Sequence, residues 1–99
     1  MEIQVKETDN NVTIMVSGDI EMMSIKKFME KLTNVGQSVD KDVVLDLTNV
    51  SYIDSSGVGV LVHLLKLQKK KGKQLQINQV SSQVLTVLQL SSLTHIFNL

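Results

Sequence analysis

The chain of 99 residues contains no cysteine, which excludes disulfide bonds, thiolate metal sites and thiol catalysis. It has only three aromatic residues, Phe28, Tyr52 and Phe97, and they lie far apart in the sequence. A base-stacking surface needs several aromatics in a basic groove, and that combination is missing. The formal net charge is zero, so bulk charge does not attract a polyanion. We therefore expect no direct contact with nucleic acid.

Long hydrophobic runs are also absent. The longest apolar stretch, residues 58–67, is interrupted by His63 and Lys66 and is far too short to span a bilayer. Residues 1–6 alternate in polarity and carry charge, which is unlike a signal peptide. The length suits one domain with one core. We therefore expect a single domain over residues 1–99, located in the cytoplasm and without membrane insertion.

The charged side chains do not suggest a metal or cofactor site. No acid or second histidine has ligand spacing to His63 or His95, so we assign no metal and no cofactor. Residues 66–73 contain five lysines: Lys66, Lys69, Lys70, Lys71 and Lys73. Because cations are favoured near the C-terminus of a helix, we interpret these lysines as a solvated helix end.

Apolar periodicity predicts alternating strands and helices in the order ββαβαβα(β). Strands are expected near residues 3–5, 12–16, 43–47 and 75–77, with a hairpin turn at 9–11 and a last edge strand at 96–99. Helices are expected at 22–35, closed by Gly36, at 58–71, closed by Gly72, and from Ser81 or Ser82 to about residue 90. Strand–helix–strand units require parallel pairing with right-handed crossovers. The order therefore predicts an α/β fold in which about three helices cover a mixed sheet of four to five strands.

The most informative segment is Asp-Ser-Ser-Gly-Val-Gly at residues 54–59, where a strand gives way to an apolar helix. Free backbone N–H groups and the helix dipole favour negative charge at a helix N-terminus. The fold would therefore tolerate a phosphate on Ser55, while the local surface would change. The simpler alternative is that Ser55 or Asp54 serves only as a helix cap.

This junction resembles the signature loop of the STAS domain, a fold shared by anti-sigma factor antagonists and the cytoplasmic domains of sulfate transporters. Residues 17–21, Ser-Gly-Asp-Ile-Glu, resemble the family's turn after the second strand. Residues 43–47 resemble its central strand, 50–57 its signature loop and 81–90 the following helix. The Asp-Ser-Ser-Gly form is typical of single-domain bacterial antagonists.

The resemblance implies a non-enzymatic regulator that acts by partner switching. In that subfamily the serine that aligns with Ser55 is phosphorylated by a partner that is both an anti-sigma factor and an ATP-dependent kinase. The unmodified antagonist binds this partner and releases a sigma factor, the phosphorylated form does not bind, and a metal-dependent serine phosphatase restores binding. An accessory subunit of a transport complex or of a stress-sensing assembly is the alternative function for a STAS domain.

The predicted helix at 58–71 is apolar on two faces. One stripe is expected against the sheet and comprises Val58, Leu61, Val62 and Leu65. The opposite stripe comprises Val60, Leu64 and Leu67 and is either sandwiched within the protein or presented to a partner. From this stripe and the resemblance together, the candidate partner-contact residues are Asp19, Glu21, Met22, Asp54, Ser56, Gly57, Val60 and Leu64.

Two features depart from the family pattern. The family turn most often ends in aspartate, where this chain has Glu21, whose extra methylene changes any close contact there. Many relatives carry a further helix after the last strand, whereas this sequence ends at Leu99. The surface that such a helix covers is expected to be left open here or to be covered by a partner.

The sequence around Ser55 and Ser56 lacks the motifs of known catalytic serines and phosphate loops. Neither serine lies in a Gly-x-Ser-x-Gly elbow, and the chain has no Gly-x-x-x-x-Gly-Lys-Ser/Thr phosphate loop. No histidine lies near Ser55 in the sequence, although the fold could bring His63 or His95 closer. We therefore predict a binding module and not an enzyme.

Overall fold

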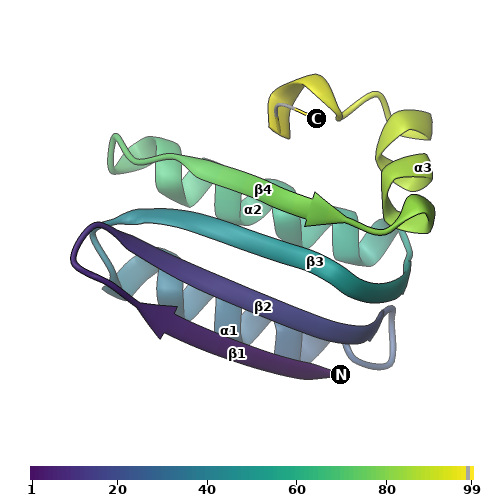
Figure 1. Ribbon diagram of the computed structural model, residues 1–99, viewed down its shortest axis with the longest axis horizontal. Helices are drawn as coiled ribbons and strands as arrows, with labels where there is room; N and C mark the ends of the chain where they lie inside the picture. Colours follow the sequence, from purple (N-terminus) through teal and green to yellow (C-terminus); the bar gives the residue numbers. More distant parts are fainter. Residues whose placement is uncertain (98) are drawn as a thin grey trace.

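Alternating apolar residues build a four-stranded sheet at the centre of the computed structural model, which describes residues 1–97 and 99. The strands are β1 (Glu2–Glu7), β2 (Asn11–Ile20), β3 (Asp42–Ile53) and β4 (Leu75–Val80), in the spatial order β1-β2-β3-β4. β1 pairs antiparallel with β2, whereas β2 with β3 and β3 with β4 are parallel. The sheet is therefore mixed, as predicted, and its parallel pairs require helical crossovers (Figure 1).

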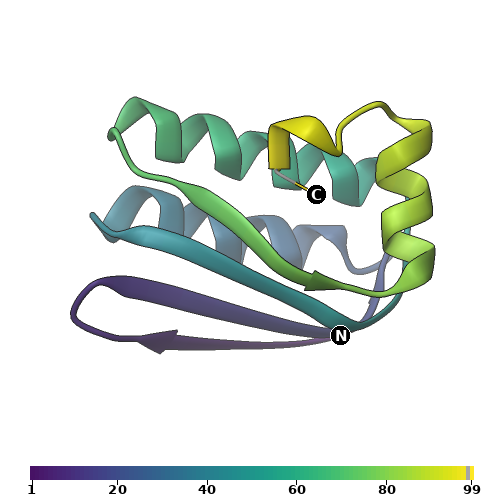
Figure 2. The same cartoon turned by 45° about the horizontal axis from the view of Figure 1, so that its top comes forward.

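Three helices and a short 3-10 turn complete the chain: α1 (Ile25–Ser38), α2 (Ser55–Lys70), α3 (Ser82–Leu90) and η1 (His95–Phe97). α1 and α2 lie side by side behind one face of the sheet (Figures 1 and 2). α3 lies at one end of the sheet and contacts β3. The predicted order ββαβαβα and the α/β class are confirmed.

The core lies between this helical layer and one face of the sheet. Val12, Ile14 and Val16 of β2 face the helices and are at most 2% exposed. The residues between them, Thr13 and Met15, are half-exposed on the open face. This period-2 alternation is what a sheet with one covered face requires.

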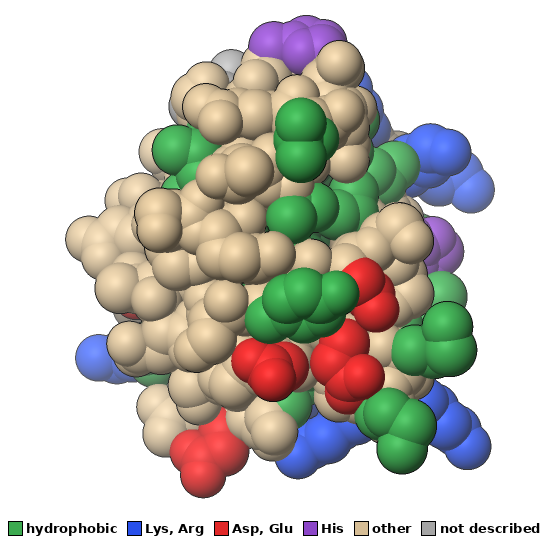
Figure 3. Space-filling model, turned by 90° about the vertical axis from the view of Figure 1, so that its right-hand side faces the viewer, with side chains coloured by type: hydrophobic (Ala, Val, Ile, Leu, Met, Phe, Trp, Pro, Cys, Tyr) green, Lys and Arg blue, Asp and Glu red, His purple; other side chains and the backbone are tan. Residues whose placement is uncertain are grey.

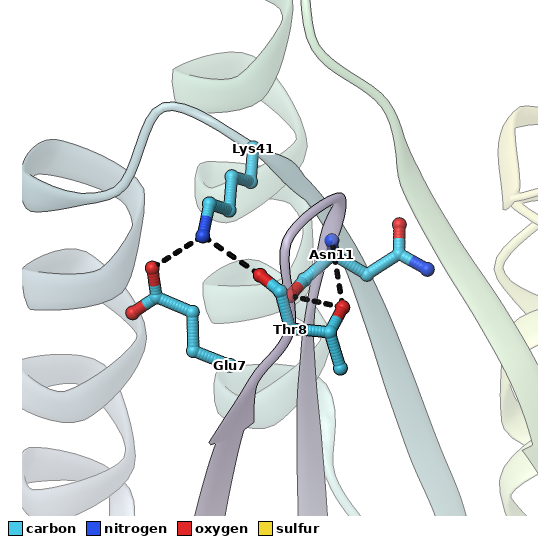
Figure 4. Close-up of polar contacts among 4 residues, drawn as sticks. All are labelled: Glu7, Thr8, Asn11 and Lys41. Carbon is cyan, nitrogen blue, oxygen red and sulfur yellow. Dashed lines mark hydrogen bonds and ion pairs between the residues drawn. The ribbon is translucent and has the colours of Figure 1, made fainter.

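The hairpin predicted at residues 9–11 is confirmed, and it closes the end of the molecule where β2 begins (Figure 4). The Thr8 N–H donates to the Asn11 carbonyl at 2.8 Å, and the Asn11 N–H donates to Thr8 Oγ1 at 3.1 Å. Lys41 Nζ lies 2.6 Å from Glu7 Oε2 and donates to the Thr8 carbonyl at 2.7 Å. These contacts attach the start of β3 to the hairpin, although a partly exposed ion pair adds little stability.

Several predicted boundaries shift. β3 runs for 12 residues instead of five, and α2 begins at Ser55, three residues before its predicted start. α1 begins at Ile25, because residues 22–24 form a turn. Gly72, with φ +70°, directly follows the C-cap of α2, in agreement with its predicted role.

Gly36 is not the C-cap of α1, because the helix continues to Ser38. A Cβ atom at Gly36 would lie 2.8 Å from Leu67 Cδ1 and 3.1 Å from Leu64 Cδ1. The missing side chain therefore lets α1 and α2 approach closely. The prediction of Gly36 as a helix cap was wrong, because this glycine serves the packing of α1 against α2.

The predicted edge strand at residues 96–99 is also wrong where the structure describes it. Residues 95–97 form η1, with the Phe97 N–H donating to the Thr94 carbonyl at 3.3 Å. Phe97 is fully buried, so the apolar end of the chain fills the core instead of extending the sheet. Asn98 lies outside the described residues.

The prediction that Val60 and Leu64 face a partner is wrong. Leu64 is 0% exposed and Val60 is 3% exposed. Leu64 lies against Gly36 of α1, so the second stripe of α2 is sandwiched within the protein. These two residues belong to the core that connects the helical layer to the sheet.

Truncation of Leu64 tests this correction. We expect Leu64→Ala to reduce the free energy of unfolding by about 2–5 kcal/mol, because a buried leucine loses its contacts and leaves a cavity. Leu90→Ala is the matched control, because Leu90 is 82% exposed and its truncation changes stability by less than about 0.5 kcal/mol. Urea unfolding of both variants measures the difference. Equal unfolding midpoints for the two variants would contradict the burial of Leu64.

Candidate functional site

The candidate site lies at the end of the molecule where β2, β3 and β4 finish and where the three long helices begin (Figure 1, right). In α/β sheets the carboxyl ends of parallel strands are the usual place for functional side chains. Asp54 joins β3 to α2 at this end, and residues 55–57 form the first turn of that helix. Residues 21–24, which join β2 to α1, lie beside them.

Asp54 is the N-cap of α2 and connects the two junctions. Its Oδ1 accepts from the Ser56 N–H at 3.0 Å, from the Gly57 N–H at 3.3 Å and from the Ser56 hydroxyl. Its Oδ2 accepts from the Met22 N–H at 3.2 Å, and its own N–H donates to the Ile20 carbonyl at 3.1 Å. One side chain therefore both begins α2 and fixes the turn that leads into α1.

The hydrogen bonds to Asp54 hold its carboxyl group in the charged form. The Ser56 hydroxyl is the largest cause that lowers the pKa of Asp54 below its usual value. The N–H groups of Gly57, Ser56 and Met22 act in the same direction, and partial desolvation opposes them. The site therefore carries a fixed negative charge at the N-terminus of α2, where the helix dipole favours it.

Ser55 is the first residue of α2 and is exposed. Its hydroxyl makes no hydrogen bond to any residue that the structure describes. The capping alternative for Ser55 is excluded, since Asp54 holds that position. Two of the N–H groups at this helix end are already bonded to Asp54, so a phosphate on Ser55 would stand beside a carboxylate instead of replacing it.

The neighbouring turn presents hydrophobic side chains to solvent. Met22 is 74% exposed and Met23 is 90% exposed. The Met23 N–H donates to Glu21 Oε2 at 3.2 Å, so the longer side chain of Glu21 orders its own turn. Figure 3 views this end of the molecule and shows acidic side chains gathered beside exposed hydrophobic ones. Exposed methionines suit contact surfaces that adapt to a partner.

The structure brings most of the predicted site residues together. Glu21 and Met22 of one junction lie beside Asp54, Ser55 and Ser56 of the other, linked by the bond from the Met22 N–H to Asp54. We call these residues, together with Met23, the acidic patch. Asp19 lies near the end of β2, opposite Tyr52 of β3. Met23 was not among the predicted contact residues, and it is exposed because residues 22–24 form a turn instead of the start of α1.

Gly57 is buried beneath the acidic patch and was predicted as a contact residue. A Cβ atom at Gly57 would lie 2.5 Å from Ile20 Cγ2 and 2.7 Å from Ile53 Cγ1. The glycine therefore lets the first turn of α2 sit directly on the ends of β2 and β3. Gly57 is therefore a packing residue of the core and not an exposed contact residue.

Two further properties of the described part of the chain bear on the site. Among residues 1–97 and 99, no group of three or more histidine, aspartate or glutamate side chains could hold a metal ion. Within the same residues, no helix is long and apolar enough to cross a membrane.

The fold and the site together define a small α/β domain with a four-stranded mixed sheet and an exposed serine at the start of α2. The family model described as "Mlab, STAS domain" matches residues 3–98. The chain therefore belongs to the STAS family, which confirms the resemblance seen in its sequence.

Curated relatives carry a regulatory name. The chain is 28% identical to an anti-sigma-B factor antagonist of Bacillus subtilis (strain 168) over all of this chain and 90% of that protein. It is 29% identical to an anti-sigma-B factor antagonist of Staphylococcus aureus (strain NCTC 8325 / PS 47) over 94% of this chain and 86% of the relative.

Solved structures share the fold. The anti-sigma factor antagonist SpoIIAA in its unphosphorylated form matches with a TM-score of 0.79 and 22% identity, over 93% of this chain and 82% of SpoIIAA. The phosphorylated form of SpoIIAA, from Bacillus, matches with a TM-score of 0.75 and 19% identity, over 95% and 86% of the two chains. At these identities the likeness concerns the fold.

Alanine at two glycines of α2 should change stability in opposite directions. Gly57→Ala is expected to reduce the free energy of unfolding by about 1–3 kcal/mol, because its Cβ collides with Ile20 and Ile53. Gly59 has nothing within 4 Å of its Cβ position, so Gly59→Ala should add about 0.5–1 kcal/mol through helix propensity. Chemical denaturation measures both, and a stabilised Gly57→Ala variant would contradict the packing described here.

The charge of Asp54 predicts a pH dependence. Since its pKa is lowered on folding, its stabilising contribution is present above the unfolded value of about 3.9 and is lost as pH falls through the folded pKa. Asp54→Ala should therefore lower the thermal midpoint at neutral pH, and its deficit relative to wild type should shrink in acid. Asp19→Ala serves as the control, because the Asp19 carboxylate accepts no hydrogen bond from the described residues. A deficit that stays constant with pH would refute the capping role of the charge.

Proposed function

We propose that this chain is an anti-sigma factor antagonist whose binding is switched off by phosphorylation of Ser55. In its unmodified form it binds an anti-sigma factor that is also an ATP-dependent serine kinase, and a sigma factor is released. A serine phosphatase reverses the modification. The chain acts in the cytoplasm as a regulator, and its enzymatic partners carry out the phosphate chemistry.

The observation that carries this proposal is the state of Ser55. Its hydroxyl is exposed and unbonded among the described residues, at the first position of a helix already capped by Asp54. Modification of Ser55 therefore removes no hydrogen bond on which the fold depends. The names of the curated relatives support the antagonist role, and SpoIIAA, which shares the fold, is a protein with a phosphorylated form.

The switch follows from the charges around Ser55. Phosphoserine brings close to two negative charges. Asp54 is adjacent, and Met22 is tied to the same carboxylate through its N–H, so the new charge arises within the acidic patch. A partner that packs an apolar or acidic group there would face repulsion or an unpaired charge. A loss of affinity on the order of a hundredfold, or about 2.7 kcal/mol, is enough to release it.

The test uses purified baits in a pull-down from the lysate of the organism that encodes the chain. Wild type is expected to capture an ATP-binding kinase of the anti-sigma type, identified by mass spectrometry, and Ser55→Asp is expected to lose it. Asn10→Asp is the control for charge, because it adds the same charge in the hairpin at the opposite end of the molecule. It should bind as wild type does.

The captured kinase then supplies the second measurement. With ATP it should phosphorylate wild type and Ser56→Ala but not Ser55→Ala, as intact-mass analysis would show. If wild type and Ser55→Asp instead capture the same transport or scaffold components, the antagonist proposal fails. The chain would then be an accessory STAS subunit whose serine is not a switch.

A further inference from the structure

On the side that faces β4, β3 loses its strand partner before it reaches the candidate site. On one side, pairing with β2 continues to Ile20 opposite Ile53. On the other side, pairing with β4 ends at Leu47 opposite Val80. Residues 48–53 of β3 therefore extend beyond β4. Their backbone groups on that side need other hydrogen-bond partners.

Side chains of α3 and its N-cap supply two of these partners. Ser81 Oγ donates to the Val50 carbonyl at 2.6 Å, and the Ile53 N–H donates to Gln83 Oε1 at 3.0 Å. Ser81 is also the N-cap of α3, and Val84 and Leu88 anchor that helix in the core at 0% exposure. The start of α3 thus takes the place that a longer β4 would occupy.

The bond to Gln83 holds the N–H of Ile53, two residues before the candidate switch. Ile53 is followed by Asp54, whose N–H is bonded on the other side to the Ile20 carbonyl. The junction is therefore fixed from two sides, by β2 and by α3. Ser55 follows Asp54 in the chain, so the orientation of its exposed hydroxyl depends on how this junction is held.

We propose that Gln83 is a positioning residue for Ser55. Its amide oxygen holds the Ile53 peptide so that Asp54 caps α2 and Ser55 is presented in a single orientation. The role in recognition of Ser55 by the kinase rests on the function proposed above, whereas the effect on the junction does not. Because Val84 and Leu88 keep α3 in place, loss of the Gln83 oxygen should loosen the junction without unfolding the domain.

Three variants separate positioning from general stability. Gln83→Leu keeps the size of the side chain and removes the acceptor, whereas Gln83→Glu keeps an acceptor oxygen. Gln89→Leu is the control, because Gln89 is exposed on the same helix. Amide hydrogen exchange of Ser56 and Gly57, measured by NMR, reports on the Asp54 cap and not directly on the bond that is removed.

Gln83→Leu should accelerate exchange at Ser56 and Gly57 by about tenfold, with the β1–β2 amides unchanged, and Gln83→Glu should restore the wild-type rates. The kinase captured by the wild-type bait should phosphorylate Gln83→Leu with a lower kcat and a little-changed KM, because the acceptor is misplaced while the docking surface persists.

Wild-type exchange rates in Gln83→Leu, or acceleration that Gln83→Glu does not reverse, would overturn the positioning role. Altered exchange with unchanged phosphorylation kinetics would overturn its link to Ser55. If the wild-type chain captures no kinase, the proposed function fails, and the exchange rates alone decide whether Gln83 holds the junction.

Discussion

The arrangement of the candidate site depends on the carboxylate of Asp54. One oxygen satisfies N–H groups at the start of α2, and the other holds the N–H of Met22 in the turn before α1. Two segments that are 32 residues apart in the chain thereby form one surface. The charge that begins the helix also leaves Ser55 free, because a helix with an N-cap does not need the hydroxyl of its first residue.

Two glycines allow close packing beneath this surface. Gly57 lets α2 rest on Ile20 and Ile53, and Gly36 lets α1 approach Leu64. α2 therefore rests on the sheet at its first turn and packs against α1 farther along its length. Under the proposed function, a charge added at Ser55 would meet a side chain that takes no part in this packing, so its effect would fall on the partner and not on the fold.

Membership of the STAS family accounts for the sheet order and the placement of the helices. The departure at Glu21 has a local explanation, since its longer side chain reaches the Met23 N–H. Apolar residues near the end of the chain form η1, and Phe97 is buried in the core.

The sequence by itself determined the element order, the mixed sheet and the position of the Asp-Ser-Ser-Gly junction, because hydrophobic period and turn residues are local signals. It did not determine which apolar stripe of α2 is covered. Val60 and Leu64 look like a contact face in the sequence, but both are buried in the structure, Leu64 against Gly36 of α1. Nor could it reveal that Gln83 bonds to Ile53 or that Asp54 holds Met22. Those contacts join segments about 30 residues apart, and only the tertiary structure decides which distant backbone groups a side chain can reach.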